Sequence, residues 1–203
     1  LVLPKDNILE NFENNYDDNK KTDLSSETKI NLTKLQKKLA ERLSKSVKKN
    51  KFERFLIDGV TGSGKTEIYF EAINEALRAG NQSLILLPEI ALVDSLFKRA
   101  KSRFGFEPAL WHSDTKVSEK RKIWNDVATG KVKLVIGARS ALFLPFKNLN
   151  LIVIDEEHDS TYKQQEQVIY NARDMAIARA SFENSVIVLA SATPSMESIF
   201  NVR

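Results

Sequence analysis

The chain has 203 residues, a formal net charge of +4 and no cysteine. This length is sufficient for one domain with a full hydrophobic core. The lack of cysteine excludes disulfides and thiolate metal sites within the chain, and no apolar run is long enough to span a membrane. The N-terminus shows no signal-peptide pattern either. We therefore expect a cytosolic globular domain with no membrane partner.

Charge is distributed unevenly along the chain. Residues 1–27 contain seven acids and three lysines, so the remaining 176 residues carry a net charge of +8. Because this first stretch has no apolar periodicity, we predict a linker or the end of a preceding domain there, and a single domain over residues 28–203. A basic body suits a polyanionic partner, although lysines that serve only solubility would give the same balance.

A helix is predicted to begin near Asn31. Its apolar face is formed by residues spaced three or four apart, namely Leu32, Leu35, Leu39, Leu43 and Val47. Its other face is basic, which by default indicates a solvated surface. The basic residues are Lys34, Lys37, Lys38, Arg42, Lys45 and Lys48.

Apolar strands alternate with amphipathic helices after this point. The predicted strands are Arg54–Asp58, Ser83–Leu87, Ala109–His112, Lys133–Gly137, Leu151–Asp155 and Val186–Ala190. The predicted helices are Thr66–Ala79, Ile90–Phe104, Ser118–Ala128 and Arg173–Ser181. This alternation predicts an α/β fold with a mainly parallel central sheet covered by helices on both faces. Ligands of such sheets bind at the carboxyl ends of the strands.

The segment from Gly59 to Thr66 has the pattern G-x-x-x-x-G-K-[ST] between a predicted strand and a predicted helix. This is the pattern of a phosphate-binding P-loop, in which backbone N–H groups surround phosphate oxygens. Lys65 would reach the β- and γ-phosphates, and the Thr66 hydroxyl would ligate Mg²⁺. The alternative is an ordinary glycine-rich turn. The predicted phosphate-binding residues are Gly59, Thr61, Gly62, Ser63, Gly64, Lys65 and Thr66.

Acidic residues follow the apolar strand Leu151–Ile154. A carboxylate at the tip of a buried strand is typical of a Walker B motif, so Asp155 is predicted to hold Mg²⁺. Glu156 is predicted to orient and deprotonate the attacking water. An acidic cluster that merely enters a solvated turn is the alternative. His158 is interpreted as a local hydrogen-bonding residue.

Small hydroxylated residues end the last predicted strand. Ser191 and Thr193 are placed to hydrogen-bond the carboxylates of the previous motif and to sense the γ-phosphate. From this stretch alone, a plain exit from strand to turn is the favoured interpretation.

Taken together, these segments resemble superfamily 2 helicases. GVTGSGKTEIY, LLPEIAL, GARSALF, VIDEEHDSTYKQ and ASATPS match motifs I, Ia, Ib, II and III in order. The Asp-Glu-Glu-His box and Tyr170-x-Ala172-Arg173-Asp174 resemble the PriA family of bacterial replication-restart helicases. The resemblance extends from about Leu32 to Ser198 and covers one RecA-like lobe.

The resemblance implies an ATP- and Mg²⁺-dependent 3′-to-5′ DNA helicase in the bacterial cytoplasm. It implies single-stranded and forked DNA as substrates, and primosome proteins and single-stranded-DNA-binding protein as partners. Residues 1–27 would then end a DNA-binding domain. The family's zinc-binding insertion and second lobe would lie beyond Arg203. We therefore expect this chain alone to hydrolyse ATP very poorly.

The resemblance also assigns roles by position. Gln36 is matched to a residue that contacts adenine, and the segments Pro88–Leu92 and Gly137–Phe143 to segments that follow one DNA strand. Thr161–Tyr170 is matched to a loop that couples DNA binding to hydrolysis, unless it is simply a solvated turn. The residues predicted to contact DNA or to couple are Arg139, Ser140, Tyr162, Lys163, Tyr170, Arg173, Ser191 and Thr193.

The chain departs from the family pattern at two places. Ile169 and Asn171 replace a basic residue and a histidine beside the loop tyrosine, and Val93-Asp94-Ser95 replaces Thr-Pro-Gln. Three other hypotheses stay open. The chain could belong to another superfamily 2 translocase, to an ATP-gated primosome scaffold, or to a plain nucleic-acid-binding module.

Overall fold

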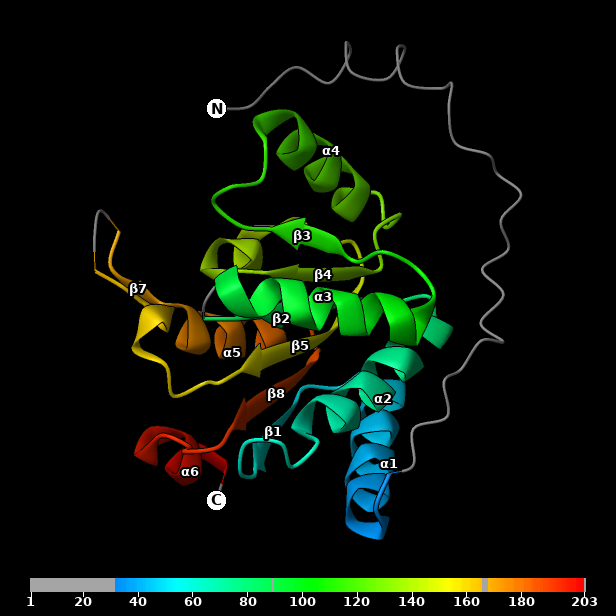
Figure 1. The fold of residues 1–203 in the computed structure, drawn as a ribbon, viewed down its shortest axis with the longest axis vertical. Coiled ribbons are helices and arrows are strands. Elements are labelled where there is room, and N and C mark those ends of the chain that lie inside the picture. The colour runs from blue at the N-terminus through cyan, green and yellow to red at the C-terminus, as the bar shows by residue number, and fades with distance from the viewer. Residues whose placement is uncertain (1–31, 89, 166–167, 203) are drawn as a thin grey trace.

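The computed structural model describes residues 32–88, 90–165 and 168–202 (Figure 1). The linker predicted at residues 1–27 lies outside this range. Within the described residues, no helix combines the length and apolar character needed to cross a membrane.

A six-stranded sheet forms the centre of the domain. Its strands are β1 (Glu53–Asp58), β2 (Gln82–Leu86), β3 (Ala109–Trp111), β4 (Leu134–Gly137), β5 (Leu149–Asp155) and β8 (Val186–Ser191). They follow the order β1-β8-β5-β2-β4-β3, and every pairing is parallel. The predicted parallel sheet is therefore confirmed. All six strands end at one edge, so the segments that follow them lie close to one another.

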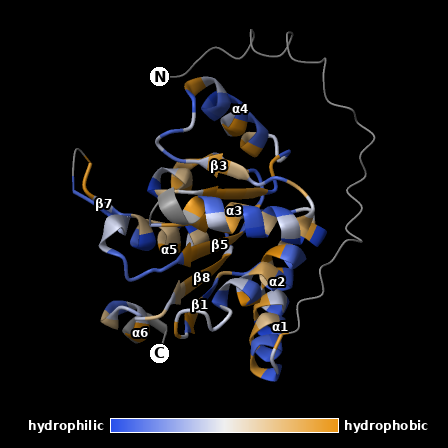
Figure 2. Ribbon diagram, viewed as in Figure 1, coloured by the Kyte–Doolittle hydropathy of each residue, from blue (hydrophilic) through white to orange (hydrophobic). Residues whose placement is uncertain are grey.

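Helices cover both faces of this sheet, as predicted (Figure 1). Because side chains alternate along a strand, the sheet contributes to two separate apolar clusters, visible as the orange centre of the molecule in Figure 2. One cluster is completed by α1 (Lys34–Lys49), α2 (Lys65–Arg78) and α3 (Ile90–Phe104). The other is completed by α4 (Val117–Ala128), the 3₁₀ helix η1 (Arg139–Phe143) and α5 (Ala172–Phe182).

Helix α1 begins later than predicted. Thr33 is its N-cap, and Thr33 and Gln36 form a reciprocal capping box. The start at Lys34 sets which side chains face the domain: Leu43 and Val47 are buried, whereas Leu35 is 66% exposed. Leu39, at 37%, is exposed as well, so the predicted apolar face is buried only towards its C-terminal end.

Several short elements lie near the carboxyl edge of the sheet, and the sequence pattern did not predict them. A 3₁₀ turn η2 (Ser160–Tyr162) follows β5, and β6 (Lys163–Gln164) pairs antiparallel with β7 (Tyr170–Asn171). Helix α6 (Met196–Val202) follows β8. Together they enclose the end of β5, where the predicted catalytic acids lie.

Candidate nucleotide-binding site and adjoining loop

The loop Gly59–Thr66 connects β1 to α2 at the carboxyl edge of the sheet. Gly62 and Gly64 have φ angles of 80° and 83°, a region that other residues avoid, and the turn depends on them. No side chain caps the N-terminus of α2. The amide groups of its first turn are therefore available to an anion, and the helix dipole favours negative charge there.

Lys65 lies against the concave side of this loop. Its ammonium donates to the carbonyl of Gly59 at 2.6 Å and lies 3.4 Å from that of Val60. The residue is only 7% exposed, so the charge is held next to the loop backbone. A triphosphate chain suits this arrangement because the lysine and the uncapped helix end both lie at the same loop.

Gln36 reaches the same loop from α1. Its Nε2 donates to the carbonyl of Ser63 at 2.8 Å, and a Cβ at Gly64 would lie 2.5 Å from that nitrogen. Thr61 lies in the same loop, and it is exposed. The structure thus brings Gln36 to the predicted site, although its contact with adenine stays a prediction.

Asp155 ends β5 and is held by two hydrogen bonds. Its Oδ2 accepts from the Tyr69 hydroxyl at 2.8 Å, and its Oδ1 accepts from the Glu156 amide at 3.1 Å. Burial raises the pKa of Asp155 above its usual range. Burial, together with the charge of Asp155, also raises the pKa of Tyr69, whose hydroxyl hydrogen-bonds with Thr66 as well. Tyr69 therefore connects the two residues predicted to bind Mg²⁺.

A hydroxyl and one carboxylate are oxygen donors of the kind that Mg²⁺ binds. Mg²⁺ commonly uses only one or two protein ligands and completes its shell with water and substrate phosphates. In the described part of the chain, no group of three or more His, Cys, Asp or Glu side chains is placed to hold a metal ion by itself. Thr66 and Asp155 thus fit Mg²⁺ bound together with a nucleotide.

Glu156 has an unusual backbone for its residue type. Its φ is 49°, in the left-handed region that only a few per cent of non-glycine residues occupy. Its carboxylate lies 3.6 Å from Nδ1 of His158. Such local strain is found preferentially at functional sites, where the surrounding structure stabilises it.

Ser191 connects the three predicted motifs. Its hydroxyl lies 2.7 Å from Nδ1 of His158 and accepts from the Thr193 amide at 3.0 Å. Its carbonyl accepts from the Gly59 amide at 3.2 Å. The predicted contact of Ser191 with the motif after β5 therefore passes through His158, and the P-loop is joined to it through the backbone.

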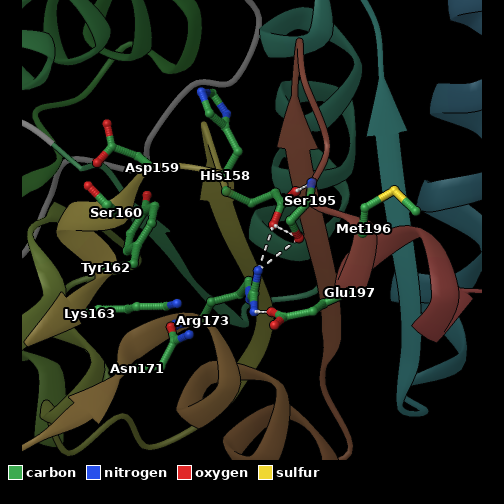
Figure 3. Close-up of a pocket in the computed structure, with 11 residues that line it drawn as sticks. His158, Asp159, Ser160, Tyr162, Lys163, Asn171, Arg173, Ser195, Met196 and Glu197 are labelled. Atoms are coloured by element: carbon green, nitrogen blue, oxygen red, sulfur yellow. Dashed lines mark hydrogen bonds and ion pairs between the residues drawn. The ribbon is translucent and has the colours of Figure 1, made fainter.

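A pocket of about 290 Å³ lies beside this site, between η2, β6, β7 and the start of α6 (Figure 3). At its wall, the Arg173 guanidinium contacts Glu157 at 3.3 Å and also pairs with Glu197. Glu157 is fully buried and accepts from the amide and hydroxyl of Ser195 and from Ser198. These bonds join the loop after β5 to α5 and to the turn after β8.

Two residues predicted to meet DNA have their side chains inside the protein. Tyr162 is 1% exposed and its hydroxyl bonds to the carbonyls of Leu86 and Asp155 at 3.0 and 2.7 Å. It is therefore not available to stack on a base, and that part of the prediction is corrected. Arg173, predicted to contact DNA or to couple, is 7% exposed and held by its ion pairs, so its side chain is not free to contact DNA, and its coupling role stays a prediction.

Ser191 is also buried, whereas Arg139, Ser140, Lys163 and Tyr170 are partly or fully exposed. Tyr170 packs edge-on against Phe143, with ring centroids 5.4 Å apart, so β7 and η1 adjoin. Ser140 is exposed and accepts a bond from the Trp111 indole at 3.1 Å. Arg139 at the start of η1 is partly exposed, and Lys163 on β6 is exposed. Side chains of Glu89 to Leu92, in the predicted strand-tracking segment, lie outside the described residues.

Comparison with known proteins agrees with this site. Residues 33–202 match the model of the DEAD/DEAH box helicase family. The chain belongs to the DEAD/DEAH box helicases. It is 57% identical to Replication restart protein PriA of Rickettsia typhi over 73% of this chain and 23% of that protein. It is 40% identical to the protein of the same name from Bacillus subtilis, over 97% of this chain and 25% of that one.

Solved structures place this helicase domain among RecA-like folds. The structure of RecG bound to a three-way DNA junction matches with a TM-score of 0.64 and 27% identity, over 84% of this chain and 22% of that chain. The helicase MrfA matches in fold, with a TM-score of 0.60 and 22% identity, over 85% and 29% of the two chains. The chain therefore spans about a quarter of the length of the relatives it matches.

Three residues of this helicase site were missed in the sequence. Tyr69 has the spacing of a core residue, and only the strand order reveals that its hydroxyl reaches Asp155. Glu157 was counted as part of an acidic cluster, although its side chain is buried and pairs with Arg173. Arg99 on α3 pairs with Glu67 at 2.7 Å and lies 3.4 Å from the Thr66 hydroxyl, a contact without any local sequence signal.

Proposed function

We propose that this chain is the ATP-binding lobe of an ATP-dependent 3′-to-5′ DNA helicase that restarts stalled replication forks. The observation that carries the proposal is the meeting of Lys65, Asp155 and Glu156 at one edge of the sheet, with Ser191 bonded to both motifs. The names of the relatives from Rickettsia typhi and Bacillus subtilis support the role in replication restart. In this proposal the protein acts in the bacterial cytoplasm.

Each residue has a defined part in the proposed hydrolysis of the β–γ bond. Lys65 and the amides of the loop hold the phosphate oxygens, and Thr66 and Asp155 hold Mg²⁺. Bound Mg²⁺ neutralises charge that develops on the phosphates. Glu156 accepts a hydrogen bond from the attacking water and takes its proton.

The DNA would lie across the surface formed by η1 and the β6–β7 hairpin. Arg139 and Ser140 would contact phosphates, and Tyr170 and Lys163 would meet a single strand. Movement of the hairpin would reach Glu156 through α5. This helix follows β7 directly, its second residue Arg173 binds Glu157, and Glu157 is the neighbour of Glu156 in the chain. In the proposal, the substrates are single-stranded and forked DNA.

Partners and remaining parts follow the family resemblance. Primosome proteins and single-stranded-DNA-binding protein are proposed partners, and zinc is proposed for a region outside this chain. A second lobe supplies arginines that stabilise the transition state in related motors, worth about 10³–10⁵ in rate. We therefore expect the 203-residue chain to bind ATP weakly and to hydrolyse it very slowly. Robust DNA-stimulated turnover by this chain alone would contradict that expectation.

Nucleotide binding tests the first step. Lys65→Ala is expected to weaken binding of a fluorescent ATP analogue by about 10–100-fold, since one charge-assisted contact is lost. Lys147→Ala, an exposed lysine at the opposite edge of the sheet, is the matched control and should bind as the unmodified chain does. Equal affinity of all three proteins would argue for a module that binds nucleic acid without nucleotide.

Hydrolysis tests the second step. In the full-length protein, Glu156→Gln is expected to retain ATP binding and to lower turnover by about 10²–10⁴-fold, the usual contribution of a general base. Strand separation should be lost to the same degree. Unwinding that survives this substitution would contradict the motor, and primosome assembly without any turnover would favour an ATP-gated scaffold.

A further inference from the structure

Helix α1 presents a strongly cationic face to solvent. We call the exposed basic residues of this helix the α1 basic face. Glu41 is the single acidic residue within the helix. Helix α1 lies beside α2 at the edge of the molecule (Figure 1). The members of the face are Lys34, Lys37, Lys38, Arg42, Lys45, Lys48 and Lys49.

The positions of these cations oppose helix stability. Lys34, Lys38 and Arg42 follow one another at four-residue steps, and Lys45 and Lys49 form another such pair. Like charges at this spacing repel each other on a helix surface. No acidic residue occupies the first turn, so Lys34 also faces the positive end of the helix dipole. An anionic partner would relieve both effects.

Among the described residues, ion pairs neutralise only the C-terminal end of the face. Lys48 pairs with Glu75 at 3.4 Å, and Lys49 lies 3.9 Å from Glu53. Among the residues that the structure describes, Lys38 has no ion-pair partner. The cations from Lys34 to Lys45 therefore have no ion-pair partner within the described part of the chain and can bind an external anion.

We propose that the α1 basic face binds the phosphate backbone of duplex DNA. A helix of 16 residues is roughly 24 Å long, and duplex DNA carries one phosphate per about 1.7 Å of its axis. Proteins that bind single strands combine charge with aromatic side chains on which bases stack. Helix α1 contains no aromatic residue, so its face matches a duplex, whose bases are hidden, better than a single strand.

This surface is separate from the one proposed for the single strand. Helix α1 belongs to the apolar cluster on one face of the sheet, whereas η1 and Tyr170 belong to the cluster on the other. The choice of DNA as the partner rests on the proposed helicase function. A duplex on α1 and a strand on η1 would let one lobe hold both arms of a fork.

Charge reversal provides the test. The full 203-residue chain is titrated against a fluorescein-labelled 30-base-pair duplex and a 30-nucleotide oligo(dT), with fluorescence anisotropy at several salt concentrations. The double variant Lys38→Glu/Lys45→Glu removes two cations of the face. The double variant Lys131→Glu/Lys147→Glu makes the same change in net charge with exposed lysines that lie outside helix α1. Circular dichroism melts establish that both variants fold.

The α1 variant is expected to lose at least about tenfold in duplex affinity and to lower the slope of log K against log salt by about 2. The control variant and the affinity for oligo(dT) should change much less. Equal losses in the two variants would mean that binding follows net charge alone and would refute the site. Unchanged duplex affinity of the α1 variant would also refute the site. The same holds if polyglutamate, and not DNA, binds to this face.

The outcomes separate this inference from the proposed function. If the unmodified chain binds oligo(dT) but not the duplex, the α1 site is wrong and the helicase proposal stands. If it binds neither DNA, both proposals lose their support.

Discussion

The ion pair between Arg173 and Glu157 gives the most direct test of how this site is held together. The Glu157 side chain is 0% exposed, and its carboxylate lies 3.3 Å from Arg173 Nη1. Removing one partner of a buried pair typically costs about 3–5 kcal/mol, because the other charge stays buried and unpaired. Ser195 and Ser198 still donate to the carboxylate, at 2.8–3.3 Å. We therefore expect Arg173→Ala to cost about 3 kcal/mol, the lower end of that range.

Urea unfolding followed by circular dichroism measures this cost. The midpoint should fall while the slope stays constant, since the surface exposed on unfolding hardly changes. A thermal melt should shift by about 6–12 °C for a domain of this size. Glu197→Ala removes a second carboxylate that pairs with Arg173, and the Glu197 side chain is largely exposed. That control should leave the midpoint nearly unchanged, because solvent screens an exposed pair.

A double-mutant cycle decides whether the buried charge is the cause. Glu157→Gln keeps the side chain in place but removes its charge, so Arg173→Ala in that background should cost at least about 1 kcal/mol less. The reasoning is refuted if the alanine variant loses less than about 1 kcal/mol, or if its cost is the same in both backgrounds.

Outcomes are predicted for four further substitutions, one of which is a control. Gly64→Ala forces φ of 83° on a residue with a Cβ, which costs about 1–2 kcal/mol, and it also displaces Gln36, so ATP affinity should fall. Gly80 has a φ of 74° and open space around it, so Gly80→Ala should lower the melting temperature but leave the affinity for ATP unchanged. Because burial raises the pKa of Asp155, stability should fall as pH rises from the ordinary carboxyl value through the raised one. Asp155→Asn should therefore melt higher than the unmodified chain at pH 7 and vary less between pH 4 and 8. Tyr162→Phe leaves two backbone carbonyls without their donor and should cost about 1–2 kcal/mol by urea unfolding.

Each of these has a clear contrary result. Equal ATP affinity of the two glycine variants would contradict the role of the Gln36 contact. A lower melting temperature for the asparagine variant at pH 7 would show that the carboxylate stabilises the native state. No loss of stability in the phenylalanine variant would mean that water replaces the buried hydroxyl.

The sequence pattern predicted most of the fold because the central strands are buried on both faces. Continuous apolar runs made them visible, and the predicted helix Ile90–Phe104 coincides with α3. The order of the strands was not predicted, because it depends on packing between segments far apart in the chain. The β6–β7 hairpin was also missed, since its strands are two residues long and pair only with each other.

Site residues were predictable where backbone geometry alone defines them. The P-loop needs glycine at fixed steps, and the acidic motif needs a carboxylate at a strand end, so both have local signatures. The link through Arg173 has none, because its partners lie 16 and 24 residues away. Tyr162 was misinterpreted for a related reason: an aromatic residue in a polar loop suggests exposure, whereas here the loop folds back over the end of β5.

The left-handed backbone of Glu156 means that directed evolution of this domain for stability would act against its proposed activity. Glycine or asparagine would adopt that conformation at lower cost. A glutamate with this left-handed backbone lowers the stability of the fold by about 1–3 kcal/mol. A library screened only for heat resistance should therefore accumulate glycine or asparagine at this position, and it would lose the proposed general base. A screen that couples survival to ATP turnover should keep the glutamate and recover stability elsewhere in the domain.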